Sequence, residues 1–275
     1  MRRFLLTSRL RVDEKGFAMS DAVLLSREDD IAVVTLNRPD RLNALDLAMW
    51  RRLGAVMSEL AEDAGRCVIV RGSGSAFGAG ADVAEFATER DTPAKAAAYA
   101  EVMGLALRAL RDCPIPTVAQ IHGACAGAGL EIAIHCDLRI AGDSSKFGAP
   151  VQRLGVTMPY PEIAALVELV GPATTLEILL EGRLYGAAEA FAKGLVSRVV
   201  PDDRLEEETR ATARRIADGA PLVHRWHKSF VRRLLDPRPL APAEVAESYI
   251  ACATHDYRQG IRAFLAKEKP RFEGR

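Results

Sequence analysis

A run of small residues between a short strand and a helical pattern constrains this chain more than any other segment. Residues 116–121 predict a strand, residues 122–129 are mostly Gly and Ala, and Glu131 precedes an apolar run. Small side chains leave the N–H groups of a turn uncovered, and a helix start adds unpaired donors. Ala128 and Glu131 fall within one helical turn, so both can face one ligand. Backbone donors beside a carboxylate suit proton abstraction next to a carbonyl group.

Strands and helices alternate along the first two hundred residues, which predicts an α/β core. Asp46 is placed to cap a helix that runs to about Glu62. A second glycine-rich loop, 72–80, follows an apolar strand. The predicted strands are 22–27, 31–36, 67–70, 116–121 and 138–141, and the helical patterns between them are 46–62, 82–88 and 93–111.

Beyond residue 161 the pattern becomes mostly helical. Pro237-Arg238-Pro239 interrupts this series and predicts a hinge or linker. We therefore expect a disordered leader at 1–18, an α/β core at 19–200 and a helical C-terminal region at 201–275. The helices expected in the last region are 206–217, 222–235, 242–253 and 257–267, preceded by an extended segment at 196–200.

Composition excludes several classes of protein. Lys and Arg together number 37 and so do Asp and Glu, a balance that argues against nucleic-acid or membrane-surface partners. No apolar run approaches the roughly 20 residues that a membrane span needs. The five cysteines form no CxxC pair, which predicts reduced thiols and a cytoplasmic protein.

Several motifs, taken in order along the chain, resemble the crotonase family, also called the enoyl-CoA hydratase/isomerase superfamily. Leu36–Leu45 resembles its early loop for coenzyme A, and Ala76–Asp82 resembles the loop with the first oxyanion-hole N–H. His122–Asp137 resembles the loop and helix with the second N–H and a catalytic acid. Phe147–Pro150, Gly194–Val196 and Gly260–Lys267 match later landmarks. Any one glycine-rich piece is weak evidence, whereas this ordered set is specific.

The resemblance implies a crotonase-like ββα spiral with a C-terminal helical trimerisation region. It implies an acyl-CoA enzyme of fatty acid metabolism, assembled as a homotrimer or a dimer of trimers. It implies no metal or redox cofactor, because coenzyme A enters as part of the thioester substrate. The oxyanion N–H groups would belong to Gly78 and Ala128, and Glu131 would be the catalytic acid. Implied substrate-binding residues are Arg41, Ala44, Ala76, Ala79, Gly80, Ala81, Asp82, Gly127, Val151, Phe264 and Lys267, of which Arg41 and Lys267 are candidate contacts of the CoA phosphates.

Two positions depart from the family's pattern. Val151 stands where a typical hydratase has a second glutamate, and valine cannot transfer a proton. Glu162 could reach the pocket instead, or could simply complement the dipole of a helix that opens at Pro161. Ala128 replaces the commoner glycine, and its N–H stays usable if its φ is negative.

These departures leave several functions open. Hydration of a 2-enoyl-CoA to a 3-hydroxyacyl-CoA is the first choice, and double-bond isomerisation, which needs one base, is the alternative. Pro159-Tyr160 resembles decarboxylases of the family, in which a tyrosine engages a methylmalonyl-type carboxylate, although the accompanying histidine would fall on Ala81. Val151 and Ala128 also leave open a non-catalytic acyl-CoA-binding protein. Cys125, in a G-x-C-x-G run, could finally be the nucleophile of a hydrolase.

Overall fold

The computed structural model describes residues 22–63 and 65–275, so the predicted leader at 1–18 lies outside the described residues. Its main sheet has six strands in the order β1-β2-β3-β4-β6-β9. β1 pairs with β2 in antiparallel fashion, and the remaining neighbours are parallel. The strands are β1 (Val23–Glu28), β2 (Ile31–Leu36), β3 (Cys67–Gly72), β4 (Thr117–Ile121), β6 (Leu138–Gly142) and β9 (Arg198–Val200).

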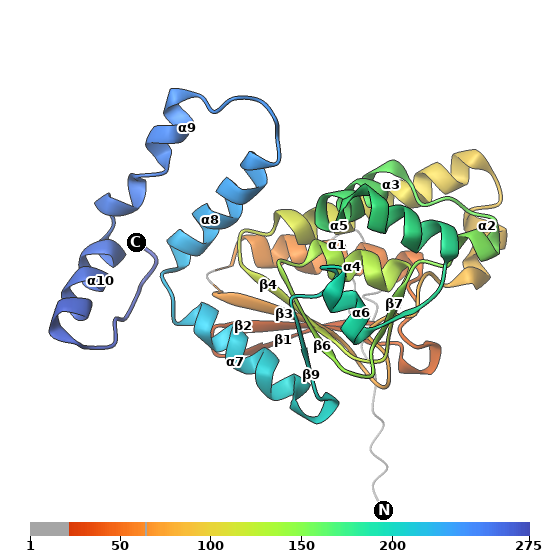
Figure 1. Cartoon of the computed structure of the whole chain (residues 1–275), viewed down its shortest axis with the longest axis horizontal. Helices are drawn as coiled ribbons and strands as arrows, with labels where there is room; N and C mark the ends of the chain where they lie inside the picture. Colours follow the sequence, from red (N-terminus) through yellow and green to blue (C-terminus); the bar gives the residue numbers. More distant parts are fainter. Residues whose placement is uncertain (1–21, 64) are drawn as a thin grey trace, which may run out of the picture.

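Apolar residues on both faces of the central strands explain why helices cover the sheet twice (Figure 1). α1 (Leu47–Ala61) and α3 (Pro93–Asp112) lie on one face, against side chains such as Val34 and Val70. α7 (Leu205–Ala217) lies on the other face, against Ile69 and its alternating neighbours on adjacent strands. α7 falls in the segment predicted as the helical C-terminal region 201–275, yet it packs on the core sheet.

Local sequence signals account for the starts of the covering helices. The carboxylate of Asp46 accepts a hydrogen bond from the Met49 N–H, so the predicted cap of α1 forms. Thr92 caps α3 in the same way, and Pro93 occupies its first position. Both helices pack against one another through buried residues such as Leu53 and Leu110.

A second, three-stranded sheet stands beside the main one and carries the region of interest. It consists of β5 (Ala124–Ala126), β7 (Lys146–Gly148) and β8 (Tyr185–Gly186), in the order β5-β7-β8. α4 (Ala128–His135) leaves directly from β5 and is buried along most of its length. The remaining short elements are η1 (Pro39–Arg41), η2 (Val83–Glu85), α2 (Phe86–Glu89), η3 (Val151–Leu154), α6 (Ala187–Ala192) and η4 (Asp202–Arg204).

α5 (Tyr160–Glu181) is long and apolar enough to meet the length and composition criteria for a membrane span. Gly171, with a φ of 77°, and Pro172 interrupt it, so neither half reaches the roughly 20 residues that a span needs. Leu166 and Ile178 are buried against the core. We therefore describe α5 as a helix of the globular fold.

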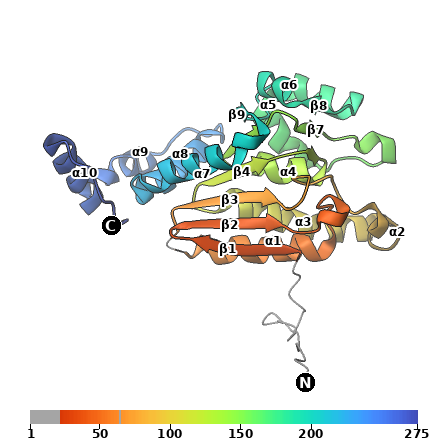
Figure 2. The ribbon, with the colours of Figure 1, turned by 90° about the horizontal axis from the view of Figure 1, so that it is seen from below.

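The last helices form an arm that extends away from the sheet (Figures 1 and 2). The arm consists of α8 (Pro221–Leu234), α9 (Pro242–Glu247), η5 (Ile250–Ala253) and α10 (His255–Ala266). The predicted helix 242–253 is thus split into α9 and η5.

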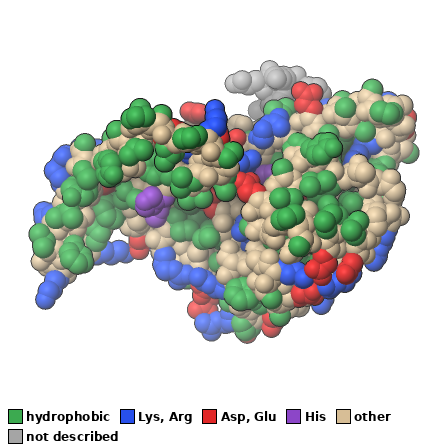
Figure 3. All heavy atoms as spheres, turned by 45° about the horizontal axis from the view of Figure 1, so that its top comes forward, with side chains coloured by type: hydrophobic (Ala, Val, Ile, Leu, Met, Phe, Trp, Pro, Cys, Tyr) green, Lys and Arg blue, Asp and Glu red, His purple; other side chains and the backbone are tan. Residues whose placement is uncertain are grey.

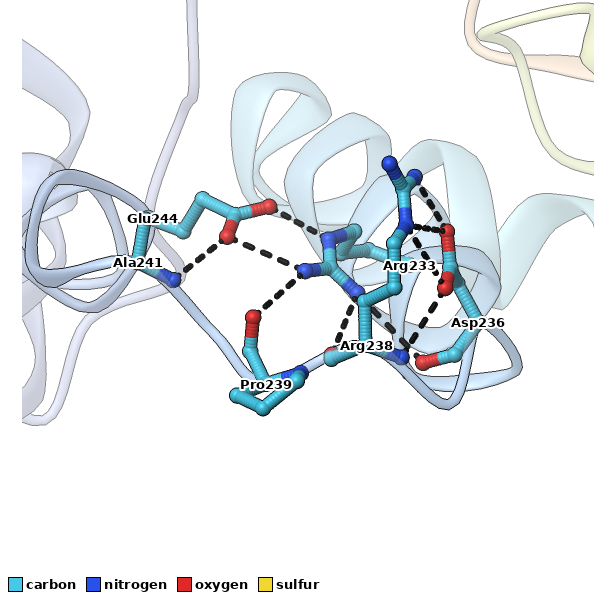
Figure 4. A network of polar contacts seen from close by, with 6 residues as sticks. All are labelled: Arg233, Asp236, Arg238, Pro239, Ala241 and Glu244. Atoms are coloured by element: carbon cyan, nitrogen blue, oxygen red, sulfur yellow. Dashed lines mark hydrogen bonds and ion pairs between the residues drawn. The ribbon is translucent and has the colours of Figure 1, made fainter.

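The proline-containing segment between α8 and α9 is a braced turn (Figure 4). The Arg233 guanidinium forms an ion pair with Glu244 and donates to the carbonyl oxygen of Pro239 at 3.1 Å. Arg238 forms a separate ion pair with Asp236. These contacts fix the direction in which α9 leaves α8.

Candidate active site

A cavity of about 130 Å³ lies beside the start of α4. Its wall combines segments from the second glycine-rich loop, α2, α3, α4 and the stretch around η3. The cavity is lined by Ala79, Gly80, Ala81, Val83, Phe86, Arg90, Met103, Gly127, Ala128, Glu131, Pro150, Val151, Leu154, Val156, Thr157, Met158 and Pro159. Most of these side chains are apolar, so a bound carbonyl group would be shielded from water.

Close backbone approach brings the two glycine-rich loops together. A Cβ on Gly129 would lie 2.1 Å from the carbonyl oxygen of Gly78, so only glycine fits there. Gly127 and Gly80 also lie close together, and both have positive φ values, 46° and 129°. Each of these two glycines immediately precedes an alanine that lines the cavity, Ala128 and Ala81.

The sequence-based choice of Gly78 as an oxyanion donor requires correction. The Gly78 N–H already donates to the Ala124 carbonyl oxygen at 2.9 Å, in a short parallel bridge to β5. Gly78 does not line the cavity. The loop therefore uses this N–H to hold itself against the second sheet.

Ala81 also takes part in a short parallel bridge, with Leu45, but here the hydrogen bonds are made by its two neighbours and not by Ala81 itself. The Leu45 N–H donates to the Gly80 oxygen, and the Asp82 N–H donates to the Leu45 oxygen, each at 2.8 Å. In a parallel bridge of this pattern, the N–H of the central residue points away from its partner strand. The Ala81 N–H is thus directed away from Leu45, and Ala81 lines the cavity.

Ala128 opens α4, so its N–H has no acceptor within the helix. Its φ is not among the positive values of the chain, so an alanine is unstrained there. The start of α4 adds the positive end of the helix dipole on the same side. The residues that carry these two N–H groups, Ala81 and Ala128, line the same cavity.

Glu131 is the carboxylate of this cavity. Its side chain lines the wall and is only 6% exposed. Burial, with a smaller contribution from the negative charge of Glu162, raises the pKa of Glu131 to about 8, against an opposing effect of Arg90. The group can hold and release a proton near neutral pH.

The residues singled out in the sequence form two groups: some line the cavity, and the others lie elsewhere. Ala79, Gly80, Ala81, Gly127 and Val151 line the cavity, together with Ala128 and Glu131. Ala76 is in the core, Ala44 lies in the loop before α1, and Arg41 is exposed on η1. Asp82 caps η2 and pairs with Arg38 at 2.8 Å. Tyr160 is 90% exposed and outside the cavity wall.

Phe264 and Lys267 belong to the arm. Phe264 lies on α10 and is 81% exposed, and Lys267 ends that helix. In both ribbon views α10 and α2 lie at opposite ends of the molecule, and α2 borders the cavity (Figures 1 and 2). Within one chain these residues therefore do not reach the cavity.

Arg90 is a cavity residue that the sequence patterns did not indicate. Its guanidinium lies 4.4 Å from the ring centre of Phe86 and 5.2 Å from that of Tyr99. It follows α2 directly and faces Glu131 closely enough to act on its charge. No periodic pattern marks it, because its role depends on how α2 folds over α3.

The nucleophile alternative finds little support in the geometry. Burial raises the pKa of Cys125, whose side chain is fully buried, so a thiolate is disfavoured. A ring nitrogen of His122 lies 2.9 Å from the Gly74 carbonyl oxygen, an ordinary backbone contact. Among the residues that the structure describes, no group of three or more His, Cys, Asp or Glu side chains could hold a metal ion.

Comparison with known proteins agrees with this fold. The sequence profile of the family described as enoyl-CoA hydratase/isomerase matches residues 26–275. A crystal structure of an enoyl-CoA hydratase/carnithine racemase from Magnetospirillum magneticum superposes with a TM-score of 0.92 at 50% identity, covering 93% of this chain and 97% of that one.

Two curated relatives extend the comparison. A probable enoyl-CoA hydratase of Mycobacterium tuberculosis is 36% identical over 93% of this chain and 99% of its own length. A crotonyl-CoA hydratase of Syntrophomonas wolfei is 31% identical over 91% of this chain and 97% of its own. The chain belongs to the enoyl-CoA hydratase/isomerase family, and the crotonase-type α/β fold expected from its motifs is confirmed.

Proposed function

We propose that this protein hydrates a 2-enoyl-CoA thioester to the 3-hydroxyacyl-CoA. The observation that supports this most directly is the meeting of two backbone donors, Ala81 and Ala128, with the Glu131 carboxyl at one apolar cavity. The hydratase names of relatives at about this level of similarity favour the same reaction. Ala81 replaces Gly78 in this proposal, since the Gly78 N–H is already engaged.

The proposed reaction divides the work between backbone and side chain. The thioester oxygen accepts hydrogen bonds from the Ala81 and Ala128 N–H groups, which stabilise the negative charge that develops on it. Glu131 takes a proton from water while the water oxygen bonds to C3, and the same carboxyl returns a proton to C2. One such backbone donor is typically worth about 3 kcal/mol of transition-state stabilisation.

Double-bond isomerisation is the second candidate, because Glu131 is the one carboxylate among the described residues of the cavity wall. A single base can remove a proton from C2 of a 3-enoyl-CoA and deliver it to C4. Val151, in the place of a second glutamate, lies on that wall without a group that could activate water. Both reactions place negative charge on the thioester oxygen, so one site could be tested for both.

Turnover of two substrates separates these candidates. We expect purified protein to consume crotonyl-CoA, followed as loss of the conjugated thioester absorbance, and Glu131→Gln to lower the rate at least about 100-fold. Conversion of a 3-enoyl-CoA without hydration of crotonyl-CoA would favour the isomerase. Binding without any turnover would favour a non-catalytic acyl-CoA-binding protein. Carbon dioxide release from methylmalonyl-CoA, lost in Tyr160→Phe, would instead establish the decarboxylase.

We further propose that the protein works in the cytoplasm as a homotrimer or a dimer of trimers. Hydrophobic side chains cluster on the surface of the arm, at left in Figure 3, and several are largely exposed. Apolar surface of this kind is usually covered in an assembly. Such an assembly could bring Phe264 and Lys267 to a neighbouring cavity, with Arg41 and Lys267 at the CoA phosphates. Sedimentation velocity tests the assembly, and a monomer would refute it.

A further inference from the structure

A second buried carboxylate lies behind the cavity wall. Glu162 belongs to the first turn of α5 and is only 2% exposed. Its Oε2 atom has no hydrogen-bond partner among the described residues. Burial raises the pKa of Glu162, and a hydrogen bond with its own backbone N–H opposes this rise. Burying the other carboxylate oxygen without a partner is costly, so a glutamate at this place requires an explanation beyond packing.

The charge of Glu162 acts on Glu131. The two side chains come from α5 and α4, which pack together. They lie close enough for the charge of Glu162 to oppose ionisation of Glu131. Burial also raises the pKa of Glu162 itself. Two carboxyl groups in this relation titrate as a pair rather than independently.

Few other charges face this pair. Arg90, which lines the cavity, favours the ionised form of both carboxyls. Arg108 acts on Glu162 from α3, but its side chain is exposed and its effect is screened by solvent. His135, one turn along α4, has a pKa lowered by burial, and its Nδ1 contacts the Glu131 backbone oxygen at 2.6 Å. One cation thus faces two acids.

We propose that Glu162 is a positioning residue of this site, a second acid whose negative charge strengthens Glu131 as a base while a thioester lies in the cavity. This inference rests on the proposed function. Glu162 does not line the cavity, so it acts through Glu131 rather than on the substrate. It would supply from α5 the second carboxyl that Val151 cannot supply from η3.

The charge balance explains how the arrangement would operate. Arg90 can neutralise one carboxylate, and repulsion then favours a proton on the other. When Glu131 removes a proton from water or from C2, the negative charge of Glu162 stabilises the protonated Glu131 that results. When Glu131 returns the proton to carbon, the pair regains its starting charge, so no other proton donor is required.

Glu162→Gln tests the proposal, because it keeps the side-chain shape and removes the charge. We expect the acid limb of the pH profile of kcat/KM to move down by about one pH unit, and the plateau rate to fall, since the base becomes weaker. Glu168→Gln is the matched control. It lies on the same helix and its partner is Arg111, at 3.9 Å, so its profile should equal that of the wild type.

A second measurement does not depend on turnover. Carbon-13 labelling of the glutamate carboxyl groups allows Glu131 to be titrated by NMR, with its signal assigned by its loss in Glu131→Gln. Glu162→Gln should lower the titration midpoint of Glu131, and Arg90→Gln should raise it. Glu162→Met, which has a similar volume and no charge, keeps the test valid if Glu162→Gln fails to fold.

The outcomes separate the two proposals. An unchanged Glu131 midpoint in Glu162→Gln, or an unchanged acid limb in an active enzyme, would overturn the role of Glu162. If Glu162→Gln does not fold, an unchanged Glu131 midpoint in Glu162→Met would overturn it in the same way. A wild type that converts neither enoyl-CoA isomer would refute the proposed function, while the NMR titration would still decide whether the two carboxyls are coupled.

Discussion

Gly129→Ala should damage the proposed oxyanion site through a contact that is visible in the backbone. The added Cβ would lie 2.1 Å from the Gly78 oxygen and 2.9 Å from its Cα, so backbone atoms, not a flexible side chain, stand in the way. Ordinary contact needs about 3.4 Å, which means that α4 and the facing loop must separate by more than about 1 Å. That movement carries the Ala128 N–H with it.

The size of the effect follows from two opposing contributions. Alanine gains up to about 1 kcal/mol over glycine inside a helix. Overpacking against backbone typically costs about 1–3 kcal/mol, so we expect a net loss of about 1–2 kcal/mol and a fall in Tm of about 3–6 °C. A displacement of about 1 Å of a catalytic group costs on the order of 100-fold in rate, so kcat/KM should fall by that factor.

The assay compares Gly129→Ala with Gly54→Ala, in α1. A Cβ on Gly54 would meet Ala106 at 3.4 Å, an ordinary contact, so this variant should keep full activity and an equal or higher Tm. Rates on crotonyl-CoA and a 3-enoyl-CoA, together with thermal unfolding, give both quantities. The reasoning is refuted if Gly129→Ala stays within about threefold of Gly54→Ala in kcat/KM, because the helix start would then not need its close approach.

Three further outcomes are expected. Glu131 has a folded-state pKa of about 8, well above its ordinary value of 4.5, so the folded protein retains a proton that the unfolded chain releases. Stability should therefore fall as pH rises from about 5 to 8, and Glu131→Gln should flatten this slope in urea unfolding. Arg139→Met should cost about 2–4 kcal/mol in the same assay, since the buried guanidinium donates to the carbonyl oxygens of Leu195 and Cys136 at 2.9 and 2.6 Å. An Arg139 variant as stable as the wild type would contradict that account. Arg233→Ala should speed proteolytic cleavage between residues 236 and 241, whereas Arg238→Ala, which loses only the local pair with Asp236, should change it less.

Local signals in the sequence predicted much of the fold. Asp46 forms the expected cap, and the strands predicted at 31–36 and 67–70 form as β2 and β3. Motifs spread over most of the chain predicted the family, which the comparisons confirm. These features depend on neighbours within a few residues or on the order of motifs, and both kinds of signal can be recognised in a single sequence.

Features set by contacts between distant segments were harder to predict. A loop of small residues does not reveal which N–H will pair with another strand, so its pattern indicates Gly78 although the Gly78 N–H donates to the Ala124 carbonyl oxygen. Arg90 reaches the cavity only because α2 folds across α3. Tyr160 follows Pro159 as in decarboxylases, but the start of α5 leaves its side chain in solvent.

Glu162 shows that the difference between features encoded locally and features set by distant contacts matters for function. It lies two positions after Tyr160 on α5, yet one side chain is buried behind the cavity and the other is exposed, because successive helix positions point about 100° apart. A catalytic carboxyl can therefore be absent from one element, as at Val151, while a second element supplies a negative charge in its place. No sequence motif marks such a change. If the pair titrates as proposed, searches for active members of this family should examine the first turn of α5 as well as the wall position occupied here by valine.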